Sequence, residues 1–407
     1  MTVLLYLTDR WPYHPGESFL TREIRDLAPH FDKVLLLPLA EIIDGERPPR
    51  EYPENVEVLS ELRENIWKQW GTSGPLSRLF GGISRPLIYC KESLISKPFK
   101  PREVIGEIAQ VRLICNQIEK NIDVKSVDAC ASFWLNRGAS VCAELKRRNH
   151  HLVAFSRGHG GDIYSERRNM ANLPLQSTSL KNLDGVLPDS SAGVDYLAQK
   201  YPNMKEKISV GRLGVADSEV VDGSTDGVLR LLSVSTLVPV KRVHLIAEGL
   251  KVCSREVVWT HIGGGECLPV IEESLKNMSE NIEVRMLGQL PHHDVLEYYQ
   301  NNPVDLFINV SSSEGLPVSI MEAFANGIPV VATAVGGCPE IVSSDCGFLL
   351  TPYFEAKELA KIVDDYDLNS TKMRMSALEK QREEYSSEKN QTAFAELIIS
   401  KINQKKS

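Results

Sequence analysis

Glu314 and Glu322 stand in the part of the sequence whose residue types are best suited to chemistry. They follow an apolar, strand-like run; Pro317 lies between them, and Gly327 comes just before the next apolar run. Proline is favoured in the first turn of a helix and glycine after its last turn. This pattern therefore predicts a loop that carries Glu314 and a helix that carries Glu322. The unpaired amides of that helix start, near residues 316–319, would point out of the helix toward a site that favours negative or oxygen-rich groups.

These carboxylates and amides together indicate a ligand rich in hydroxyl and phosphate oxygens. Carboxylates accept hydrogen bonds from hydroxyls, and the first amides of a helix favour negative or oxygen-rich groups. Two solvated acids around a helix start are the common alternative for a pair of glutamates. The surrounding pattern argues against that alternative here.

Three further segments place polar residues or glycines directly after strand-like runs. In 232–242, Lys241 stands just after a strand-like run, although taken alone it would be a surface lysine at a helix start. In 261–266, three glycines permit close approach of a nucleotide or simply form a tight turn. In 157–162, His159 is flanked by glycines, which favours a functional role over a turn-stabilising one.

Two other patterns carry less weight. The loop Tyr13-His-Pro-Gly-Glu17 has a single glycine, Gly16, where the backbone could approach a ligand closely. Its histidine, His14, is equally well explained as an exposed loop residue. Asp365-Tyr-Asp367 has the spacing of some metal sites but lies in an acidic, helix-like stretch, where a solvated face explains it better. We expect that the chemistry needs no metal ion.

The elements that must position these residues form two series of short apolar runs, each followed by a helix-length segment. The first series is 3–8, 33–39, 127–133, 151–155 and 185–188. The second is 228–235, 257–262, 282–287, 304–310 and 328–333, with helices at about 242–253, 267–278, 292–300 and 318–326. Continuous apolar runs are typical of parallel strands that helices cover on both faces. The sequence therefore predicts an α/β protein with two doubly wound, Rossmann-like domains that face each other across an interdomain cleft.

A length of 407 residues suits two domains of about 200 residues each. We expect an N-terminal domain at 1–216, a linker at 217–227 and a C-terminal domain at 228–375. The linker assignment depends on its Asp, Ser, Gly and Thr content. Residues 376–407 are expected to form a helical segment that could pack back on the N-terminal domain.

Residues from about 43 to 105 break the rhythm and are expected to form an irregular insertion. From Arg63 to Arg102, eight lysines and arginines stand against two acids, with aromatic residues between them. Basic residues attract anionic headgroups and aromatic side chains insert at the interface, so the segment 63–102 predicts a peripheral membrane contact. A solvated face explains the pattern equally well, and both interpretations stay open.

The composition is that of an ordinary globular protein, with 42% hydrophobic and 25% charged residues. A net charge of −8 argues against a nucleic-acid binder, which would have a basic domain. Eight scattered cysteines without a Cys-x-x-Cys pair indicate free thiols in a reducing compartment. No uncharged run approaches the length of about 20 residues that a membrane span requires. We therefore expect a cytoplasmic protein, at the inner face of the cell membrane if residues 63–102 contact it.

The glutamate spacing and its surroundings resemble the family 4 retaining glycosyltransferases of the two-Rossmann-domain, or GT-B, type. The resemblance depends on Glu314-x7-Glu322, on Gly-Leu-Pro after the first glutamate, and on Val-Gly-Gly-x-x-Glu at 335–340. It spans nearly the whole chain and is strongest from about 228 to 350. It implies that the C-terminal half binds a nucleotide-sugar donor and the N-terminal half a glycan or lipid-linked acceptor. Closure of the cleft would exclude water.

By this resemblance, Glu314 would contact hydroxyls of the donor sugar, Glu322 would hold the ribose, and Lys241 would neutralise the diphosphate. His159 would lie near the reacting sugar. The implied catalytic residues are His159, Lys241 and Glu314. The implied donor-binding residues are Gly16, Lys241, Arg242, Gly263, Gly264, Leu290, Glu314, Gly315, Leu316, Pro317, Val318 and Glu322.

One position departs from the family pattern. The family often has an arginine where this chain has Thr236, so one cation is missing on the phosphate side and Arg242 would have to compensate. Other stretches, 157–162 and 238–242, look like those of enzymes that build bacterial surface polysaccharides.

The resemblance implies transfer of a sugar with retention of its anomeric configuration. No residue stands out as a conventional nucleophile, so we expect front-face displacement assisted by the leaving diphosphate. UDP is the commoner donor nucleotide in such enzymes, and GDP stays open; no other cofactor is implied. Two alternatives remain. One is a nucleotide-sugar 2-epimerase on the same fold, whose acid/base set we do not find here; the other is a nucleotide-sugar-binding protein without turnover, which the departure at Thr236 keeps open.

Overall fold

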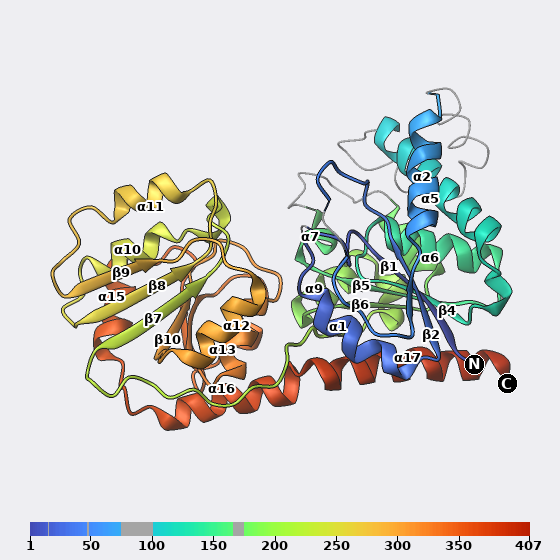
Figure 1. Cartoon of the computed structure of the whole chain (residues 1–407). Helices are drawn as coiled ribbons and strands as arrows, with labels where there is room; N and C mark the ends of the chain where they lie inside the picture. The colour runs from blue at the N-terminus through green and yellow to red at the C-terminus, as the bar shows by residue number, and fades with distance from the viewer. Residues whose placement is uncertain (15, 47–48, 75–100, 166–174) are drawn as a thin grey trace. The chain divides into compact units, whose positions relative to one another are not determined.

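The computed structural model describes residues 1–14, 16–46, 49–74, 101–165 and 175–407. The chain divides into two compact units (Figure 1). Unit 1 comprises residues 1–212 and 388–407, and unit 2 comprises residues 213–387. The chain thus leaves unit 1 after Arg212 and returns to it at Glu388.

The described residues of unit 1 form a sheet of six parallel strands in the order β3-β2-β1-β4-β5-β6. The strands are β1 (Val3–Thr8), β2 (Lys33–Pro38), β3 (Val56–Val58), β4 (Ala129–Ser132), β5 (Val153–Gly158) and β6 (Gly185–Pro188). Strand β1 lies between β2 and β4 and is buried along its whole length, which explains its continuous apolar run.

Helices cover both faces of this sheet. They are α1 (Leu20–Leu27), α2 (Ser60–Thr72), α5 (Pro101–Asn121), α6 (Arg137–Arg148), α7 (Gly160–Ile163), α8 (Gln176–Asn182), α9 (Ser191–Lys200) and α17 (Ser387–Lys406). Leu5 of β1 shares a core with α2, α5 and α6. Helices α1 and α17 cover the other face (Figure 1). There Tyr6 contacts Glu23, and Phe155 contacts Phe394.

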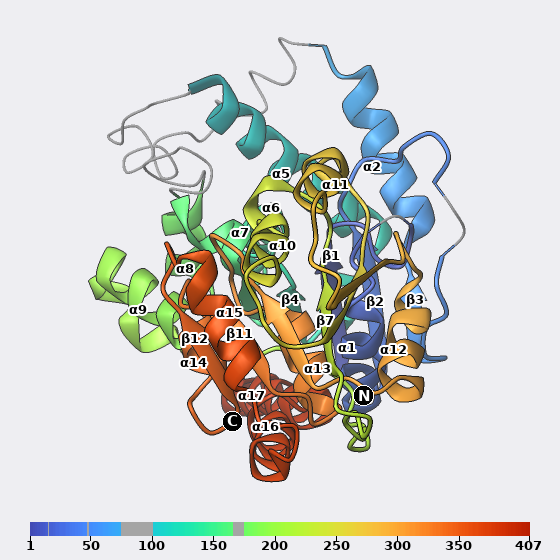
Figure 2. The same cartoon turned by 90° about the vertical axis from the view of Figure 1, so that its left-hand side faces the viewer.

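The described residues of unit 2 form a second parallel sheet of six strands, in the order β12-β11-β10-β7-β8-β9. The strands are β7 (Leu229–Val234), β8 (Val257–Ile262), β9 (Ile282–Met286), β10 (Leu306–Asn309), β11 (Val330–Thr333) and β12 (Gly347–Leu350). Figure 2 looks at this unit and shows β12, β11 and β7 in that order across the sheet.

The helices of unit 2 also lie on both faces of its sheet. They are α10 (His244–Leu250), α11 (Leu268–Ser274), α12 (His292–Asn301), α13 (Val318–Ala325), α14 (Cys338–Ile341), α15 (Ala356–Asp365) and α16 (Thr371–Glu384). Ile246, Ile271 and Leu359 bring α10, α11 and α15 into one core with Trp259 of β8. On the other face, Tyr299 of α12 packs against Phe307 of β10 with ring centroids 6.5 Å apart.

Both sheets have the strand order of a doubly wound fold, so the predicted fold class of two Rossmann-like α/β sheets is confirmed. In such a sheet the order of the strands reverses between two central strands, and ligands bind beyond their carboxyl ends at this switch point. The switch point lies between β1 and β4 in unit 1 and between β7 and β10 in unit 2.

Some elements differ from those expected. Strand β3 lies in the region predicted as an irregular insertion, of which residues 75–100 fall outside the described part of the chain. The predicted C-terminal segment 376–407 is divided between the two units, since α16 lies in unit 2 and α17 belongs to unit 1 from Glu388 onward. Among the described residues, no helix is both long enough and apolar enough to cross a membrane.

Candidate active site

Lys241 and Glu314 form an ion pair at the switch point of unit 2. Lys241 closes a short 3₁₀ turn after β7, and Glu314 lies in the loop between β10 and α13. The Lys241 Nζ donates to the Glu314 Oε1 at 2.6 Å. The side chain of Lys241 is 25% exposed and that of Glu314 is 10% exposed. The structure therefore brings together two of the three predicted catalytic residues where a doubly wound sheet binds its ligand.

The Glu314 carboxylate is fixed by neighbours at the end of β10 and in its own loop. Asn309 Nδ2 and Ser311 Oγ donate to the same Oε1, at 3.2 and 2.6 Å. The predicted Val335–Glu340 stretch packs on this loop through Gly336, which has a φ of +53°. A Cβ there would lie 1.9 Å from the Glu314 carbonyl oxygen, so a side chain at 336 would displace the carboxylate's loop.

The start of α13 supplies backbone donors beside Glu314. Pro317 is the residue that precedes the helix, and Val318 is its first residue. Within the described part of the chain, the amides of Leu316 and Val318 donate no hydrogen bond. They are available to ligand oxygens, and the positive end of the helix dipole adds to their attraction for negative groups.

Arg242 has a supporting position that differs from the one expected. It adopts a left-handed conformation with a φ of +48°, and its guanidinium donates to the carbonyls of Val310, Ser311 and Pro352 at 2.8, 3.1 and 2.8 Å. These contacts bind the ends of β10 and β12 together. The expectation that Arg242 replaces the cation missing at Thr236 is not supported, because three of its donors face backbone carbonyls.

The glycines after β8 are explained mainly by packing of one loop on another. Gly263 and Gly265 have φ values of +145° and +156°. A Cβ on Gly263 would lie 1.8 Å from the Ser235 carbonyl oxygen, and one on Gly265 would lie 2.4 Å from that of Leu237. At Gly264 the nearest atom would be 3.5 Å away. The backbone needs glycine at 263 and 265, whereas 264 has room for a side chain.

Glu322 lies within α13 as predicted, and it has a partner that sequence reasoning missed. His292, the first residue of α12, places its Nε2 2.7 Å from the Glu322 Oε1. The hydrogen bond to Glu322 raises the pKa of His292, against the opposing effect of burial. The two residues are 30 positions apart. The only hint of this role in the sequence is that His292 lies two residues after Leu290, a predicted donor contact.

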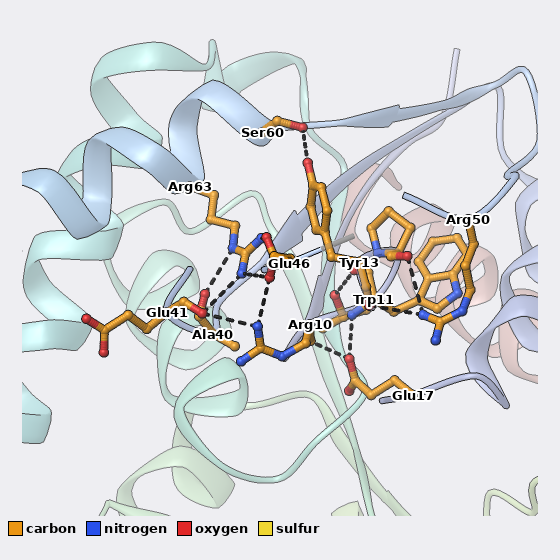
Figure 3. A network of polar contacts seen from close by, with 12 residues as sticks. Arg10, Trp11, Tyr13, Glu17, Ala40, Glu41, Glu46, Arg50, Ser60 and Arg63 are labelled. Atoms are coloured by element: carbon orange, nitrogen blue, oxygen red, sulfur yellow. Dashed lines mark hydrogen bonds and ion pairs between the residues drawn. The ribbon is translucent and has the colours of Figure 1, made fainter. Parts of the chain in front are cut away.

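In unit 1, the loop after β1 is organised by the carboxylate of Glu17 (Figure 3). Its Oε2 accepts hydrogen bonds from the amides of Arg10 and Trp11 at 2.5 and 2.6 Å. Its Oε1 accepts one from the indole of Trp134 at 2.6 Å. Trp134 follows β4, so this carboxylate joins the two loops at the switch point of unit 1. Glu17 was not among the site residues predicted from the sequence.

Gly16 and His14 belong to the same loop. Gly16 has a φ of +100°, a backbone conformation that favours glycine, and no described atom lies within 4 Å of where its Cβ would be. Arg50 donates to the carbonyls of Tyr13 and Gly16 at 3.1 and 2.7 Å and contacts the His14 Nδ1 at 3.2 Å. His14 is thus a partner of Arg50 in the structure.

Arg63 is buried beside this loop. It is 2% exposed, makes two hydrogen bonds of 2.8 Å to the Glu46 carboxylate, and lies over the ring of Tyr13 at 4.7 Å (Figure 3). Burial acts to raise the pKa of Glu46, but Arg63 and Arg10 outweigh it and lower that pKa. Arg63 was counted in the basic segment expected to contact a membrane, and its burial removes it from any such surface.

His159, the third predicted catalytic residue, lies in unit 1 between β5 and α7. Its Nδ1 is 3.2 Å from the Asp189 carboxylate, and its Nε2 is 3.1 Å from the Phe133 carbonyl oxygen. The ring also stacks on Phe133 at 4.2 Å. The two contacts hold the ring by both of its nitrogens. Asp189 was missed from the sequence because it follows a different strand, β6.

Asp162 holds the backbone at His159. Its carboxylate accepts hydrogen bonds from the amides of His159 and Leu135, both at 2.5 Å. Burial raises the pKa of Asp162 from 3.8 to about 7, although His159 and these amides act to lower it. The carboxyl group therefore ties the loops after β4 and β5 together.

Arg157 begins the same motif and is 1% exposed. It donates to Glu23 at 3.1 Å and to the carbonyls of Gly211 and Arg212 at 2.7 and 2.6 Å. Its guanidinium lies over Phe394 of α17 at 5.4 Å. This arginine anchors the segment through which the chain leaves unit 1.

Residues 220–384 match the family of group 1 glycosyl transferases. The O-antigen biosynthesis glycosyltransferase WbnH of Escherichia coli is 37% identical to this chain over 142 residues, which are 34% of this chain and 38% of the relative. Across the curated relatives compared, the chain spans no more than 62% of the relative's length.

Solved structures match over nearly the whole chain. HepE of Anabaena in complex with UDP has a TM-score of 0.65 and 17% identity, with 98% of this chain and all of that one covered. Sucrose-phosphate synthase of Thermosynechococcus elongatus has a TM-score of 0.70 and 15% identity, with 99% and 100% covered. At these identities the likeness shows the fold. Residues 220–384 are therefore similar to the group 1 glycosyl transferases, family 4, and the two sheets of the chain are those of the GT-B fold.

Proposed function

We propose that this protein transfers a sugar, with retention of anomeric configuration, from a UDP-sugar to a glycan or lipid-linked acceptor in polysaccharide biosynthesis. The observation that carries the proposal is the Lys241–Glu314 pair at the switch point of unit 2, beside the unpaired amides of Leu316 and Val318. The lysine cation suits the diphosphate oxygens of a nucleotide sugar, and the carboxylate suits its hydroxyls. The backbone amides can donate to either kind of oxygen.

The pair has a clear division of labour in the proposed reaction. The Lys241 ammonium has three donors and gives one of them to Glu314. Its charge would stabilise the diphosphate as the sugar–phosphate bond breaks and negative charge builds on the leaving oxygen. Glu314, fixed by Asn309 and Ser311, would accept hydrogen bonds from hydroxyls of the sugar.

The proposed displacement takes place on one face of the sugar. The acceptor hydroxyl oxygen forms the new bond to the anomeric carbon as the bond to the diphosphate breaks, and its proton passes to the leaving phosphate. Glu314 accepts sugar hydroxyls rather than a transferred proton in this scheme. The amides of Leu316 and Val318 would orient donor oxygens without any change of protonation.

Relatives support the choice of donor and pathway. HepE was solved with UDP bound, and WbnH is named for O-antigen biosynthesis.

The contacts of His159 to Asp189 and to the Phe133 carbonyl favour a positioning role for this residue. Proton transfer by the ring, or direct contact of the ring with the sugar, would break one of these two contacts.

The deciding experiment measures donor binding and turnover with the same protein. Thermal shift against a panel of UDP- and GDP-sugars identifies the donor, since a ligand of the folded state raises the melting temperature. Transfer to an acceptor extract is then compared for the wild type, for Lys241→Ala and for Lys251→Ala. Lys251 forms a salt bridge to Glu248 on α10, away from the Lys241–Glu314 pair, and serves as a matched lysine control.

Four outcomes separate the competing functions and test the metal-free chemistry. Transfer of the sugar with retention supports the proposal, whether or not EDTA is present; loss of turnover with EDTA, restored by a metal, contradicts the metal-free chemistry. Isomerisation of the donor without an acceptor would identify a 2-epimerase. Donor binding without transfer or isomerisation would identify a binding protein.

A further inference from the structure

The carboxylate of Glu322 is held on one side only. Glu322 is 6% exposed within α13, and its Oε1 accepts the 2.7 Å hydrogen bond from His292. Among the described residues, no group donates a hydrogen bond to its Oε2, and this oxygen is not fully buried. One oxygen is thus bound by the protein, and the other can accept a hydrogen bond from a ligand.

His292 is placed to control this carboxylate. It is the first residue of α12, and its side chain is 43% exposed, so it spans the distance between solvent and the buried acid. It follows the loop 287–290, which lies against the glycine loop after β8: the amide of Gly263 donates to the Gly288 carbonyl at 2.8 Å. The histidine and Glu322 therefore stand on the same loop edge of the sheet as the glycine loop.

We infer that His292 is a positioning residue for the nucleoside of the donor: it fixes Glu322 so that the free carboxylate oxygen accepts the ribose hydroxyls. The inference depends on the proposed function, because it takes the donor to be a ribonucleotide sugar. A carboxylate at the end of a flexible side chain loses rotamer entropy when it binds a ligand. A histidine that already holds it in place reduces that loss, as preorganisation does in general.

A purely structural link between α12 and α13 is the competing explanation. It predicts that loss of His292 lowers stability and affects all nucleotide ligands alike. The positioning role predicts a loss confined to ligands that carry ribose hydroxyls. The adjacent His293 provides the matched control, since it lies on the same turn of α12 but pairs with Asp294 at 2.7 Å.

The test compares UDP with 2′,3′-dideoxy-UDP, which keeps the base and diphosphate and lacks the ribose hydroxyls. Affinities are measured by calorimetry for the wild type, His292→Leu, His292→Gln and His293→Leu. Glutamine keeps an N–H donor near the imidazole position, whereas leucine removes it. The preference for UDP over the dideoxy analogue should fall about tenfold in His292→Leu, the scale of one lost hydrogen bond to a charged group.

Further readouts complete the pattern. His292→Gln should restore most of the preference, and His293→Leu should leave it unchanged. In transfer assays, His292→Leu should raise KM for the donor sugar and leave kcat unchanged.

An unchanged preference in His292→Leu, or an equal loss for both nucleotides, would overturn the inference while leaving the proposed function intact. A wild type that binds neither UDP nor GDP would overturn the proposed function and the inference together. If GDP is bound instead of UDP, the same comparison with 2′,3′-dideoxy-GDP decides the question.

Discussion

The two units share one strand order but differ in what lies at the switch point. In unit 2, a lysine from the loop after β7 faces a glutamate from the loop after β10. In unit 1, the corresponding loops after β1 and β4 meet at the carboxylate of Glu17, which accepts from two backbone amides and an indole. Unit 2 therefore presents charged side chains that a ligand can take over. In unit 1 the amides of Arg10 and Trp11 already donate hydrogen bonds to Glu17 of the same unit.

This difference indicates that topology alone does not make a binding site. Both sheets reverse their strand order at a switch point, which is where doubly wound folds bind ligands. What distinguishes them is whether the polar groups there are satisfied internally. The Lys241 ammonium keeps donors for a diphosphate, whereas the amides of Arg10 and Trp11 are committed to Glu17 and stabilise the loop.

The largest effect is expected at the unit 2 switch point. Lys241→Ala and Glu314→Ala should each lower transfer by about 100-fold to 1,000-fold, the range for loss of one preorganised group that stabilises developing charge. The fold-loss of transfer in the double variant should be much smaller than the product of the two single fold-losses, because the two groups act on one donor. Lys251→Ala should retain wild-type turnover. Near-normal rates in either single variant would refute the site.

A smaller effect is expected at the unit 1 switch point. Glu17→Ala leaves the amides of Arg10 and Trp11 without their acceptor, so the free energy of unfolding should fall by about 1–3 kcal/mol. Thermal unfolding against Glu51→Ala, a change of an exposed glutamate in the same unit, isolates this loss. Donor affinity should not change. If both variants unfold at the same temperature, Glu17 does not organise the loop.

The two units should also respond to pH in opposite directions, beginning with Asp162 in unit 1. Burial raises its pKa from 3.8 to about 7, so the folded state holds this proton more tightly than the unfolded state. The stabilisation from this group is complete below about pH 4 and is lost as pH rises to about 7. Relative to Asp162→Asn, the wild type should therefore lose stability across this range in urea unfolding. Parallel pH curves for the two proteins would contradict it.

His261 in unit 2 should give the opposite slope. It is fully buried, and burial lowers its pKa from 6.5 to about 4. The unfolded state then binds the proton more tightly, so stability is present above pH 6.5 and is lost as pH falls toward 4. The same unfolding series with His261→Gln should show the wild type losing its advantage at acid pH. A wild-type advantage that does not depend on pH would show that this imidazole is not excluded from water.

The sequence predicted those parts of the structure that depend on local pattern. Glu314 lies in a loop and Glu322 in a helix, as Pro317 and Gly327 indicated, because helix starts and ends are set by a few neighbouring residues. The continuous apolar runs gave the buried parallel strands for the same reason. The edge strands β3 and β12, of three and four residues, were not predicted, because they are only partly buried, unlike the fully buried four-residue strands β4, β6, β10 and β11.

The sequence did not predict partners that only the fold brings together. Arg242 was predicted from the sequence to contact phosphate. In the structure its guanidinium donates to three carbonyls that follow β10 and β12. Asp189 reaches His159, and His292 reaches Glu322, across 30 positions in each case. Such contacts depend on which strands and helices become neighbours, and spacing along one chain does not encode that.

The return of the chain to unit 1 has a consequence for its synthesis. Phe394, Ala395 and Ile398 of α17 are buried in unit 1, yet the ribosome makes them after the whole of unit 2, residues 213–387. At about 5–20 residues per second, unit 2 takes about 10–35 s to emerge. Throughout that time the nascent unit 1 lacks the helix that covers Phe155. Unit 1 is the first unit to be started and the last to be completed.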